Sequence, residues 1–439
     1  MYPTKNRAYT RHKLPKSANP FKKYLQWANN NFQHIAFLNS ANHKTDAYSG
    51  FDAILAAGAV YEICPKQEHP AFEQLRNFCD THPDWKFGFF SYDLKNQLED
   101  LSSNNPDGVK MPLMHFFIPE VLFIFKEDSI ELGIHSSSRL TSPEKIIKEI
   151  QSIEIKPLQQ PGVTIKHRVC REEYIRQVNR IRAHIQKGDI YEANYCIEFY
   201  DDQAIINPLD CYFSLSSDNP APFSCYYRYR NKYLISSSPE RFLAKRGKTI
   251  VSQPIKGTIG RGKNSEEDNQ LKKRLLNDPK ERSENVMIVD LVRNDLSHTA
   301  EKGSVKVEEL FGIYSYTHVH QMISTITSIL KPGIHYTDVI KNAFPMGSMT
   351  GAPKIRAMQI IEECEATQRG LYSGAVGYFT PDGDFDFNVV IRSILYNQTD
   401  NFISFMAGSA ITFGSDPEKE YSECLLKARS LAHTLNSDL

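Results

Sequence analysis

Four glutamates, in two segments predicted to be helical, are placed to act together. Glu281 and Glu284 lie three residues apart, and Glu420 and Glu423 repeat that spacing. Residues at positions i and i+3 share one helix face, so each pair presents two carboxylates in one direction. Four carboxylates brought together repel one another unless a hard cation neutralises them, and Mg²⁺ is the natural occupant. Each pair taken alone is more typical of a solvated helix face, because basic residues flank it.

Lys256 is the second candidate, in the short stiff segment PIKGT (254–258) that directly follows a strand predicted at 249–253. An amine is a nucleophile only when it is neutral, and at the reference pKa near ~10.4 about one lysine in two thousand is neutral at pH 7. Lowering that pKa by ~3 units costs ~4 kcal/mol, which burial or a neighbouring cation can supply. We therefore expect a lowered pKa if Lys256 is catalytic. The alternative is a surface lysine beside Arg261 and Lys263.

The loop GSMTGAPK (347–354) invites comparison with a phosphate-binding loop. Three residues rather than four separate its glycines, and Pro353 stands where the motif needs lysine, so it is not a Walker A sequence. We expect the loop to present backbone N–H groups, or the hydroxyl of Ser348 or Thr350, to an anion at the start of a helix. A plain turn into that helix is the alternative.

Composition excludes several classes of protein. The 439 residues carry 52 basic and 52 acidic side chains, a formal net charge of +0, so no field spans the molecule to hold nucleic acid. No apolar run approaches the ~20 residues that a bilayer requires. The eight cysteines are scattered without a C-x-x-C pair, which indicates neither a zinc site nor a disulfide scaffold. The sequence predicts a soluble, cytoplasmic protein with no nucleic-acid or membrane partner.

The elements that must position these residues group into strands and helices that do not alternate. Pro and Gly interrupt the stretch 151–167, so we place a boundary there, between regions 1–160 and 165–435. Strand 190–200 alternates apolar residues with a polar row that includes Glu192. Other predicted strands are 35–39, 86–92, 121–126, 223–229, 233–237, 242–245, 249–253, 304–310, 374–379, 385–396 and 402–411. Predicted helices are 172–187, 266–276, 283–296, 336–343, 352–363 and 416–435. This grouping predicts an α+β fold with largely antiparallel sheets.

Seven motifs follow one another between Arg171 and Leu431. They are SSSPERF (236–242), PIKGTIGRG (254–262), ENVMIVDLVRNDL (284–296), PMGSMTGAPK (345–354), YSGAVGY (372–378), VVIRS (389–393) and SDPEKEYSE (415–423). In this order they resemble the chorismate-utilising enzymes, which include component I of anthranilate synthase and of aminodeoxychorismate synthase. Isochorismate and salicylate synthases are related members of that family. FLNSA (37–41) and GFFSYDLKNQLEDL (88–101) extend a weaker resemblance towards the N-terminus. The resemblance implies a large sandwich of two antiparallel β-sheets flanked by helices, with the site between the sheets.

The lysine distinguishes the branches of that family. Anthranilate synthases carry PIAGT, whereas aminodeoxychorismate synthases carry PIKGT, as here. The resemblance implies that Lys256 attacks C2 of chorismate as the 4-hydroxyl leaves, and that ammonia then attacks C4 to give 4-amino-4-deoxychorismate, for p-aminobenzoate and folate biosynthesis. It also implies that Glu240, in SPE, is the general acid that protonates the departing hydroxyl.

The remaining roles are likewise implied by the resemblance. Glu284 and Glu423 match direct Mg²⁺ ligands, and Glu281 and Glu420 match carboxylates that hold metal waters; the metal would neutralise the ring carboxylate of chorismate. Arg392 and Tyr372 match residues that hold the enolpyruvyl carboxylate. The implied substrate-binding set is Thr258, Tyr372, Arg392, Gly408 and Ser409.

Two positions depart from the family pattern. Gln321, in QMIS, stands where the family has the histidine of HLVS, so the role of that histidine is either filled by Gln321, with His320 adjacent, or lost. Glu192 stands where aminating members have glutamine and isochorismate synthases have the lysine that activates water. A carboxylate there could accept a proton from ammonium, whereas isochorismate-type chemistry lacks its base.

The resemblance also bears on the source of ammonia. None of the eight cysteines has a neighbouring glycine, as the nucleophile of glutamine amidotransferases does. Ammonia is therefore expected from solution or from a separate glutamine amidotransferase subunit. Two alternatives stay open: anthranilate synthase component I, and a non-catalytic regulator that binds chorismate or tryptophan, since FLNSA resembles a segment that holds tryptophan in related enzymes.

Overall fold

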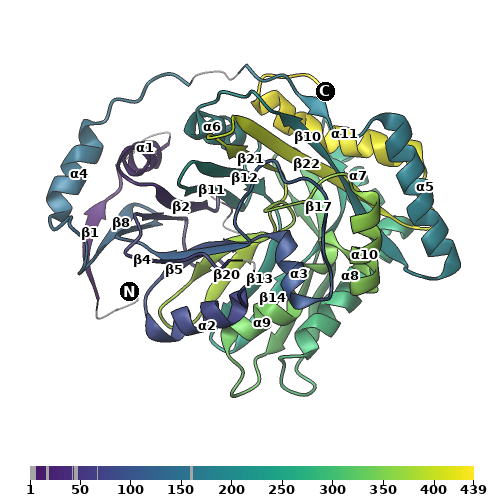
Figure 1. Cartoon of the computed structure of the whole chain (residues 1–439), viewed down its shortest axis with the longest axis horizontal. Coiled ribbons are helices and arrows are strands. Elements are labelled where there is room, and N and C mark those ends of the chain that lie inside the picture. Colours follow the sequence, from purple (N-terminus) through teal and green to yellow (C-terminus); the bar gives the residue numbers. More distant parts are fainter. Residues whose placement is uncertain (1–5, 16–18, 42, 44–47, 67, 159–161) are drawn as a thin grey trace.

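Two large antiparallel sheets form the centre of the molecule (Figure 1). The computed structural model describes residues 6–15, 19–41, 43, 48–66, 68–158 and 162–439. The twelve-stranded sheet contains, in order, β1 (Arg7–Lys13), β8 (Ser129–His135), β7 (Val121–Lys126), β3 (Ala53–Ala57), β2 (His34–Asn39), β11 (Phe223–Tyr229), β12 (Lys232–Ser238), β21 (Ser393–Asn397), β22 (Phe402–Ile411), β10 (Glu192–Asp201) and β18 (Gly351–Ala352), with β9 (Lys166–His167) also paired to β10.

The ten-stranded sheet lies against the first one. It contains, in order of pairing, β15 (Ile255–Gly260), β17 (Val319–Ile329), β14 (Thr249–Gln253), β13 (Arg241–Arg246), β20 (Phe385–Asn388), β19 (Ala375–Phe379), β5 (Lys86–Phe90), β6 (Met114–Ile118) and β4 (Tyr61–Ile63), and β16 (Lys306–Ser315) also pairs with β17. Strands β14 and β15 pair with successive parts of β17. The predicted α+β sandwich of antiparallel sheets is confirmed.

Helices cover the outer faces of both sheets. They are α1 (Lys22–Asn31), α2 (Ala71–Thr81), α3 (Lys95–Leu98), α4 (Pro143–Ser152), α5 (Arg171–Lys187), α6 (Pro208–Asp218), α7 (Ser265–Asn277), α8 (Pro279–Ser297), α9 (Tyr336–Ala343), α10 (Lys354–Cys364) and α11 (Pro417–Thr434), with short 3₁₀ turns η1 (Tyr92–Leu94) and η2 (Gly347–Met349). Helices α1, α5, α6, α10 and α11 pack on the twelve-stranded sheet, and α2, α7, α8 and α9 lie on the side of the ten-stranded sheet (Figure 1). Among the described helices, none has the length and apolarity that a bilayer crossing requires.

The alternation of side chains along β10 shows how the two cores arise. Tyr195 and Ile197 belong to the core under the outer helices, whereas Cys196 belongs to the core between the sheets. Successive side chains of a strand point to opposite faces, so Glu192 shares the inner face with Cys196. The inward polar row predicted for this strand therefore faces the space between the sheets.

One predicted strand is wrong. The segment predicted as a continuous strand at 385–396 is two strands in different sheets, β20 and β21. Residues 389–392 carry the chain between the sheets, and Arg392 has a left-handed backbone, with φ +51. No glycine or proline in 385–396 marks this crossing, and both flanking strands are largely buried.

The boundary predicted near 151–167 lies between α4 and α5. Strands from both sides of it build both sheets: β2 pairs with β11 in one, and β5 pairs with β19 in the other. The division of the chain into regions 1–160 and 165–435 stays a prediction. Both sheets contain strands from each of these two regions.

Candidate active site

Helices α8 and α11 begin in the same way, and this places their glutamates. The side chain of Asp278 accepts two backbone N–H groups at the start of α8, and Asp416 does the same at the start of α11. In each helix a proline follows at the first position, where no N–H is needed. The caps fix where each helix starts, so both glutamate pairs fall within the first two turns.

The two glutamate pairs come together where the starts of α8 and α11 meet. The ammonium of Lys280 lies 3.3 Å from Glu420 Oε1 and 3.7 Å from Glu284 Oε1, so one cation spans both helices. Glu284 and Glu420 are buried, and Glu284 Oε1 and Glu420 Oε2 have no hydrogen-bond partner among the described residues. Buried carboxylate oxygens without donors are costly unless a cation meets them. The solvated-face alternative is therefore wrong for Glu284 and Glu420.

The pKa values of these glutamates also reflect their burial and the charges that surround them. Burial raises the pKa of Glu284 to about 7, with Lys256 acting against it and Glu192 adding to it. Burial also raises the pKa of Glu281. Glu423 is different: burial raises its pKa, but Lys427, whose ammonium lies 2.7 Å from Glu423 Oε1, helps to bring it below the ordinary value. The donor set, all carboxylate oxygen and partly unsatisfied, fits Mg²⁺.

Lys256 lies inside the molecule and not on its surface. Its ammonium donates a hydrogen bond to Glu192 Oε1 at 2.6 Å, and both side chains are buried. The prediction of a stiff connection after β14 is corrected: Lys256 belongs to a further strand, β15, whose pairing with β17 shifts register between Ile255 and Thr258. Lys256 and Glu192 come from different sheets, so their contact spans the sandwich.

The expected lowering of the lysine pKa is wrong for this structure. Burial lowers the pKa of Lys256, but the nearby carboxylates Glu192, Glu284 and Glu240 raise it by more, so it lies above its ordinary value. The lysine is therefore held as an ammonium in contact with a carboxylate. It becomes a nucleophile only after its proton moves, and Glu192 is the group within hydrogen-bond distance.

Gly257 allows the neighbouring backbone to approach the acidic helix. Its φ is +95, and a Cβ there would lie 3.1 Å from Glu281 Oε2. A side chain at this position would be strained by the backbone and crowded by the glutamate. The glycine thus brings the lysine strand and α8 into contact.

Glu240 is a buried carboxyl between β12 and β13. Burial raises its pKa to about 7, while a hydrogen bond from Ser348 and the charge of Lys256 act in the opposite direction. The Ser348 hydroxyl donates to Glu240 Oε1 at 2.7 Å. The sequence predicted that the 347–354 loop offers a hydroxyl to an anion. In the structure that anion is a carboxylate of the chain itself. Such a carboxyl is half protonated near neutral pH, as a general acid requires.

Arg392 and the end of β22 form the third part of the site. The Arg392 guanidinium makes no side-chain hydrogen bond or ion pair within the described ranges. Strand β22 pairs with β21 only over residues 402–405 but with β10 over residues 403–411. Beyond residue 405, on the side where the chain enters β21 from Arg392, the backbone of β22 has no strand partner. The carbonyl oxygens of Ala407 and Gly408 accept from Cys424 Sγ and Lys427 Nζ. An unpaired guanidinium near this strand edge suits a carboxylate.

Gly408, Ser409 and Tyr372 are all built into this part of β22 and its surroundings. A Cβ on Gly408 would lie 2.4 Å from the Tyr195 carbonyl oxygen, so the residue must be glycine. The Ser409 hydroxyl lies 3.3 Å from the Tyr174 hydroxyl, and the Tyr372 hydroxyl lies 3.9 Å from Cys196 Sγ. Tyr372 is buried, which raises its pKa well above the ordinary value and keeps the phenol neutral.

Thr258 and Gln321, two further positions that the sequence singled out, differ in solvent exposure. Thr258 is exposed on β15 and pairs with Gln321 on β17. Gln321 is buried, and its Oε1 has no hydrogen-bond partner among the residues that the structure describes. His320 cannot substitute for the missing histidine, because its two ring nitrogens contact Asp268 Oδ1 and Ser315 Oγ, both at 2.9 Å. Gln321 is thus the polar group available at that position.

Three participants were not predicted in their observed roles. Glu192 was considered only as a proton acceptor for ammonium, yet it holds Lys256. Ser348 contacts Glu240, and Lys280 joins the two acidic helices. Their spacing along the chain gives no sign of these contacts; the polar residues on the inward row of strand 190–200 were the only available signal, and it pointed to Glu192.

The fold agrees with comparisons to known proteins. A family model described as chorismate binding enzyme matches residues 21–433. Aminodeoxychorismate synthase component 1 of Bacillus subtilis is 33% identical over 362 residues, covering 79% of this chain and 76% of the relative. Anthranilate synthase component 1 of Thermus thermophilus is 35% identical over 378 residues, covering 82% and 80%. The crystal structure of anthranilate synthase component I from Streptococcus pneumoniae matches with a TM-score of 0.75 and 27% identity, covering 89% of this chain and 94% of that one. The chain belongs to the family of chorismate binding enzymes.

Proposed function

We propose that this chain is an aminodeoxychorismate synthase component 1, which converts chorismate and ammonia to 4-amino-4-deoxychorismate. The observation that carries the proposal is the buried contact of 2.6 Å between Lys256 and Glu192, beside the acidic cluster. A relative of that name in Bacillus subtilis supports it, and the anthranilate synthases of similar identity keep the alternative open. The cytoplasm is the proposed location.

In the first half of the proposed reaction, Glu192 takes a proton from Lys256, and the neutral amine attacks C2 of chorismate. The C4–oxygen bond breaks as the ring double bonds shift, and Glu240 donates its proton so that the hydroxyl leaves as water. A covalent amine intermediate divides one difficult substitution into two easier ones. Ser348 holds the Glu240 carboxyl in place.

In the second half, ammonia attacks C4 and the C2–nitrogen bond to Lys256 breaks. The electron pair of that bond returns to the lysine nitrogen, which takes back the proton that Glu192 received in the first half. The proton lost by the incoming ammonia returns to Glu240, which gave up its own to the departing hydroxyl. The enzyme is then restored with Lys256 and Glu192 paired. Arg392 and Tyr372, with backbone N–H groups near Gly408 and Ser409, would hold the enolpyruvyl carboxylate throughout. Thr258 would contact the ring side.

Glu284 and Glu423 would hold Mg²⁺ directly, and Glu281 and Glu420 would hold its waters. When bound, the ion supplies positive charge that neutralises the ring carboxylate of chorismate. The unsatisfied oxygens of Glu284 and Glu420 support this placement. Lys280 balances part of the same charge in the structure.

The test is the mass of the intact protein after incubation with chorismate and Mg²⁺ but without ammonium. An adduct of the dehydrated chorismate ring, mapped to the peptide that contains Lys256, is the expected result. Lys256→Ala should lose the adduct and form only slow anthranilate or isochorismate-type products. Lys256→Arg should be inactive because guanidinium stays protonated. Lys263→Ala, an exposed lysine nearby, is the matched control. No adduct, together with wild-type product formation by Lys256→Ala, would contradict the mechanism.

Anthranilate synthase component I is the second candidate, and the fluorescence of anthranilate separates it from the first. A pocket lined by Leu38, Asn39, Ser40, Phe223 and Arg241 includes three of the five FLNSA residues. It supports a third candidate, a regulator that binds tryptophan or chorismate without catalysis. The intact set of Lys256, Glu240 and the glutamate pairs weighs against that reading, because binding alone does not need them.

A further inference from the structure

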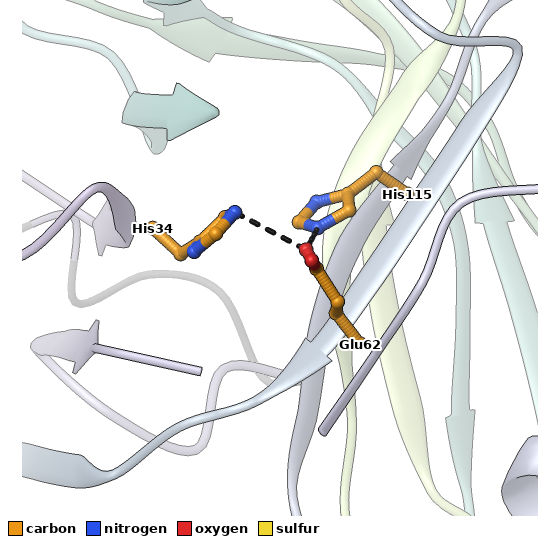
Figure 2. Close-up of side chains that lie close together, drawn as sticks. All are labelled: His34, Glu62 and His115. Atoms are coloured by element: carbon orange, nitrogen blue, oxygen red, sulfur yellow. Dashed lines mark hydrogen bonds and ion pairs between the residues drawn. The ribbon is translucent and has the colours of Figure 1, made fainter. Parts of the chain in front are cut away.

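Two histidines and a glutamate converge at a place remote from Lys256. His34 begins β2, Glu62 lies on β4 and His115 lies on β6. Figure 2 shows the carboxylate end of Glu62 between the two imidazole rings. Glu62 Oε2 lies 3.1 Å from His34 Nε2 and 3.1 Å from His115 Nε2, and the three ligand atoms lie within 4.8 Å of one another. Seven strands, β17, β14, β13, β20, β19, β5 and β6, lie between β4 and β15, the strand that carries Lys256.

Only one of the two histidines forms a hydrogen bond with Glu62. His115 Nε2 forms a hydrogen bond with Glu62, but His34 Nε2 is buried and has no hydrogen-bond partner in the described chain. A single carboxylate oxygen therefore faces two ring nitrogens and bonds to one. His115 is completely buried, and its Nδ1 contacts the Tyr227 hydroxyl at 2.7 Å, which fixes the orientation of the ring. Histidines that bind metals are oriented in this way through their second nitrogen.

The protonation states also suit a cation. Burial lowers the pKa of His34 to about 4, and burial lowers the pKa of His115 as well. The hydrogen bond with His115 lowers the pKa of Glu62 to about 2. At neutral pH the cluster is therefore two neutral imidazoles and one carboxylate, the forms in which these side chains bind metals. Arg230 lies 3.5 Å from the other oxygen of Glu62, so Oε2 is the one directed to the histidines.

We propose that His34, Glu62 and His115 bind a divalent transition-metal cation, with Zn²⁺ as the expected ion. Bonds of about 2.0–2.2 Å at tetrahedral angles place ligand atoms about 3.3–3.6 Å apart. Both distances from Glu62 to a histidine are 3.1 Å, and the two histidine nitrogens lie within 4.8 Å of each other. Two nitrogen donors and one oxygen favour Zn²⁺ over Mg²⁺, which prefers oxygen. Three protein ligands leave a fourth position for water, and Glu62, the most exposed of the three, gives access from solvent.

The ion would join the two sheets. His34 belongs to the twelve-stranded sheet, whereas Glu62 and His115 belong to the ten-stranded sheet. A cation held by both would stabilise the folded chain, because it binds a geometry that the unfolded chain lacks. The site is therefore structural and separate from the chemistry at Lys256.

The test uses the full chain, stripped with chelator and kept in excess Mg²⁺ so that the acidic cluster is occupied. Zn²⁺ titration should give one tight site per chain, and Co²⁺ should give visible absorption bands of a nitrogen-containing, low-symmetry site. His34→Gln and Glu62→Gln should each weaken Zn²⁺ binding by about 100-fold or more. His82→Gln is the matched control, because its ring packs on Tyr61 beside Glu62 but lies outside the cluster. Zn²⁺ should raise the Tm of the wild type and of His82→Gln, and leave Glu62→Gln unchanged.

The proposal is overturned if the wild type binds no stoichiometric Zn²⁺, or if both variants bind it as tightly as the wild type. It is also overturned if Glu284→Gln abolishes binding while Glu62→Gln retains it, because the ion then occupies the acidic cluster. Should His34→Gln fail to fold, Glu62→Gln replaces a partly exposed side chain with one of the same shape. The Co²⁺ spectrum of the wild type requires no variant.

Discussion

At the scale of single residues, opposing effects of burial and of neighbouring groups set the pKa values of the buried side chains in the site. Lys256 is pulled towards the neutral form by burial and towards the charged form by three carboxylates. Glu240 is pushed towards the protonated form by burial, while Ser348 stabilises its ionised form. Each side chain is therefore placed so that a small change in its surroundings, such as the arrival of substrate, moves a proton.

Replacing Ser348 should shift the pH dependence of the first half-reaction. Ser348 donates to Glu240 Oε1, which stabilises the ionised carboxylate and lowers its pKa. Ser348→Ala removes that donor, so the pKa of Glu240 rises further above about 7 and the acid stays protonated at higher pH. We expect the alkaline limb of adduct formation to move to higher pH, measured by intact mass without ammonium between about pH 6 and 9.

The control for that measurement is Ser252→Ala, a buried serine whose hydroxyl donates to a backbone carbonyl instead of a carboxylate. Its pH profile should match the wild type. An alkaline limb that stays in place in Ser348→Ala, or moves to lower pH, would show that Glu240 is not the acid whose ionisation limits the reaction.

At the scale of elements, the site depends on the capped starts of α8 and α11 and on the loop at η2. The glutamate pairs could be predicted from the sequence, because i, i+3 spacing defines a face within one helix. The contact between Lys256 and Glu192 could not, because the two residues are 64 positions apart and meet through the packing of two sheets. The break at Arg392 was missed for a related reason: two buried strands of different sheets follow each other with no glycine or proline between them to mark the crossing.

Activity should require the acidic faces of both helices. Glu284→Gln or Glu423→Gln removes a ligand charge, so each variant should need far more Mg²⁺ or lose turnover altogether. The measurement is product formation against Mg²⁺ concentration. Glu418→Gln, on α11 but exposed and paired with Arg171, should follow the wild-type curve. Full turnover of the wild type in excess EDTA would refute the requirement.

The ion pair of Arg369 and Glu365 should make the strongest polar contribution to the stability of the fold near the loop at η2. Arg369 is buried, lies 2.7 Å from Glu365 Oε1, and donates to the carbonyl oxygens of Met349 and Asn194. Arg369→Leu leaves a buried carboxylate unpaired and should lower the free energy of unfolding by about 3–5 kcal/mol in urea titration. Arg293→Leu, which breaks the exposed pair with Asp290, should cost less than about 1 kcal/mol. Similar losses for both would contradict this ranking.

At the scale of the whole molecule, the motifs predicted the family and the class of fold, because they recur in a fixed order along the chain. They did not predict how residues on both sides of 151–167 interleave in the same sheets. Pairing partners such as β5 and β19 lie far apart in sequence, and no local pattern specifies which strands meet. The cluster of His34, Glu62 and His115 escaped prediction for the same reason, since its members come from three strands.

The isolated chain should use ammonium and not glutamine. No cysteine has a neighbouring glycine, and burial raises the pKa of the thiols of Cys79, Cys196, Cys211, Cys225, Cys364 and Cys424, which keeps them protonated. Turnover with ammonium should rise with pH as more NH₃ forms, whereas glutamine should support none until a separate amidotransferase is added. Glutamine-driven turnover by the purified chain alone would contradict a two-subunit system.

The pairing of β5 with β19 also has a consequence for how the chain is made. Phe90 pairs with Ala375, so the first strand of that pair leaves the ribosome long before its partner exists. At about 5–20 residues per second the wait is on the order of 15 to 60 s. During that time β5, which becomes entirely buried, can pair with β6 but lacks its other neighbour, β19. One edge of β5 therefore stays unpaired until residues 375–379 emerge, and we expect cool expression to increase the yield of folded protein.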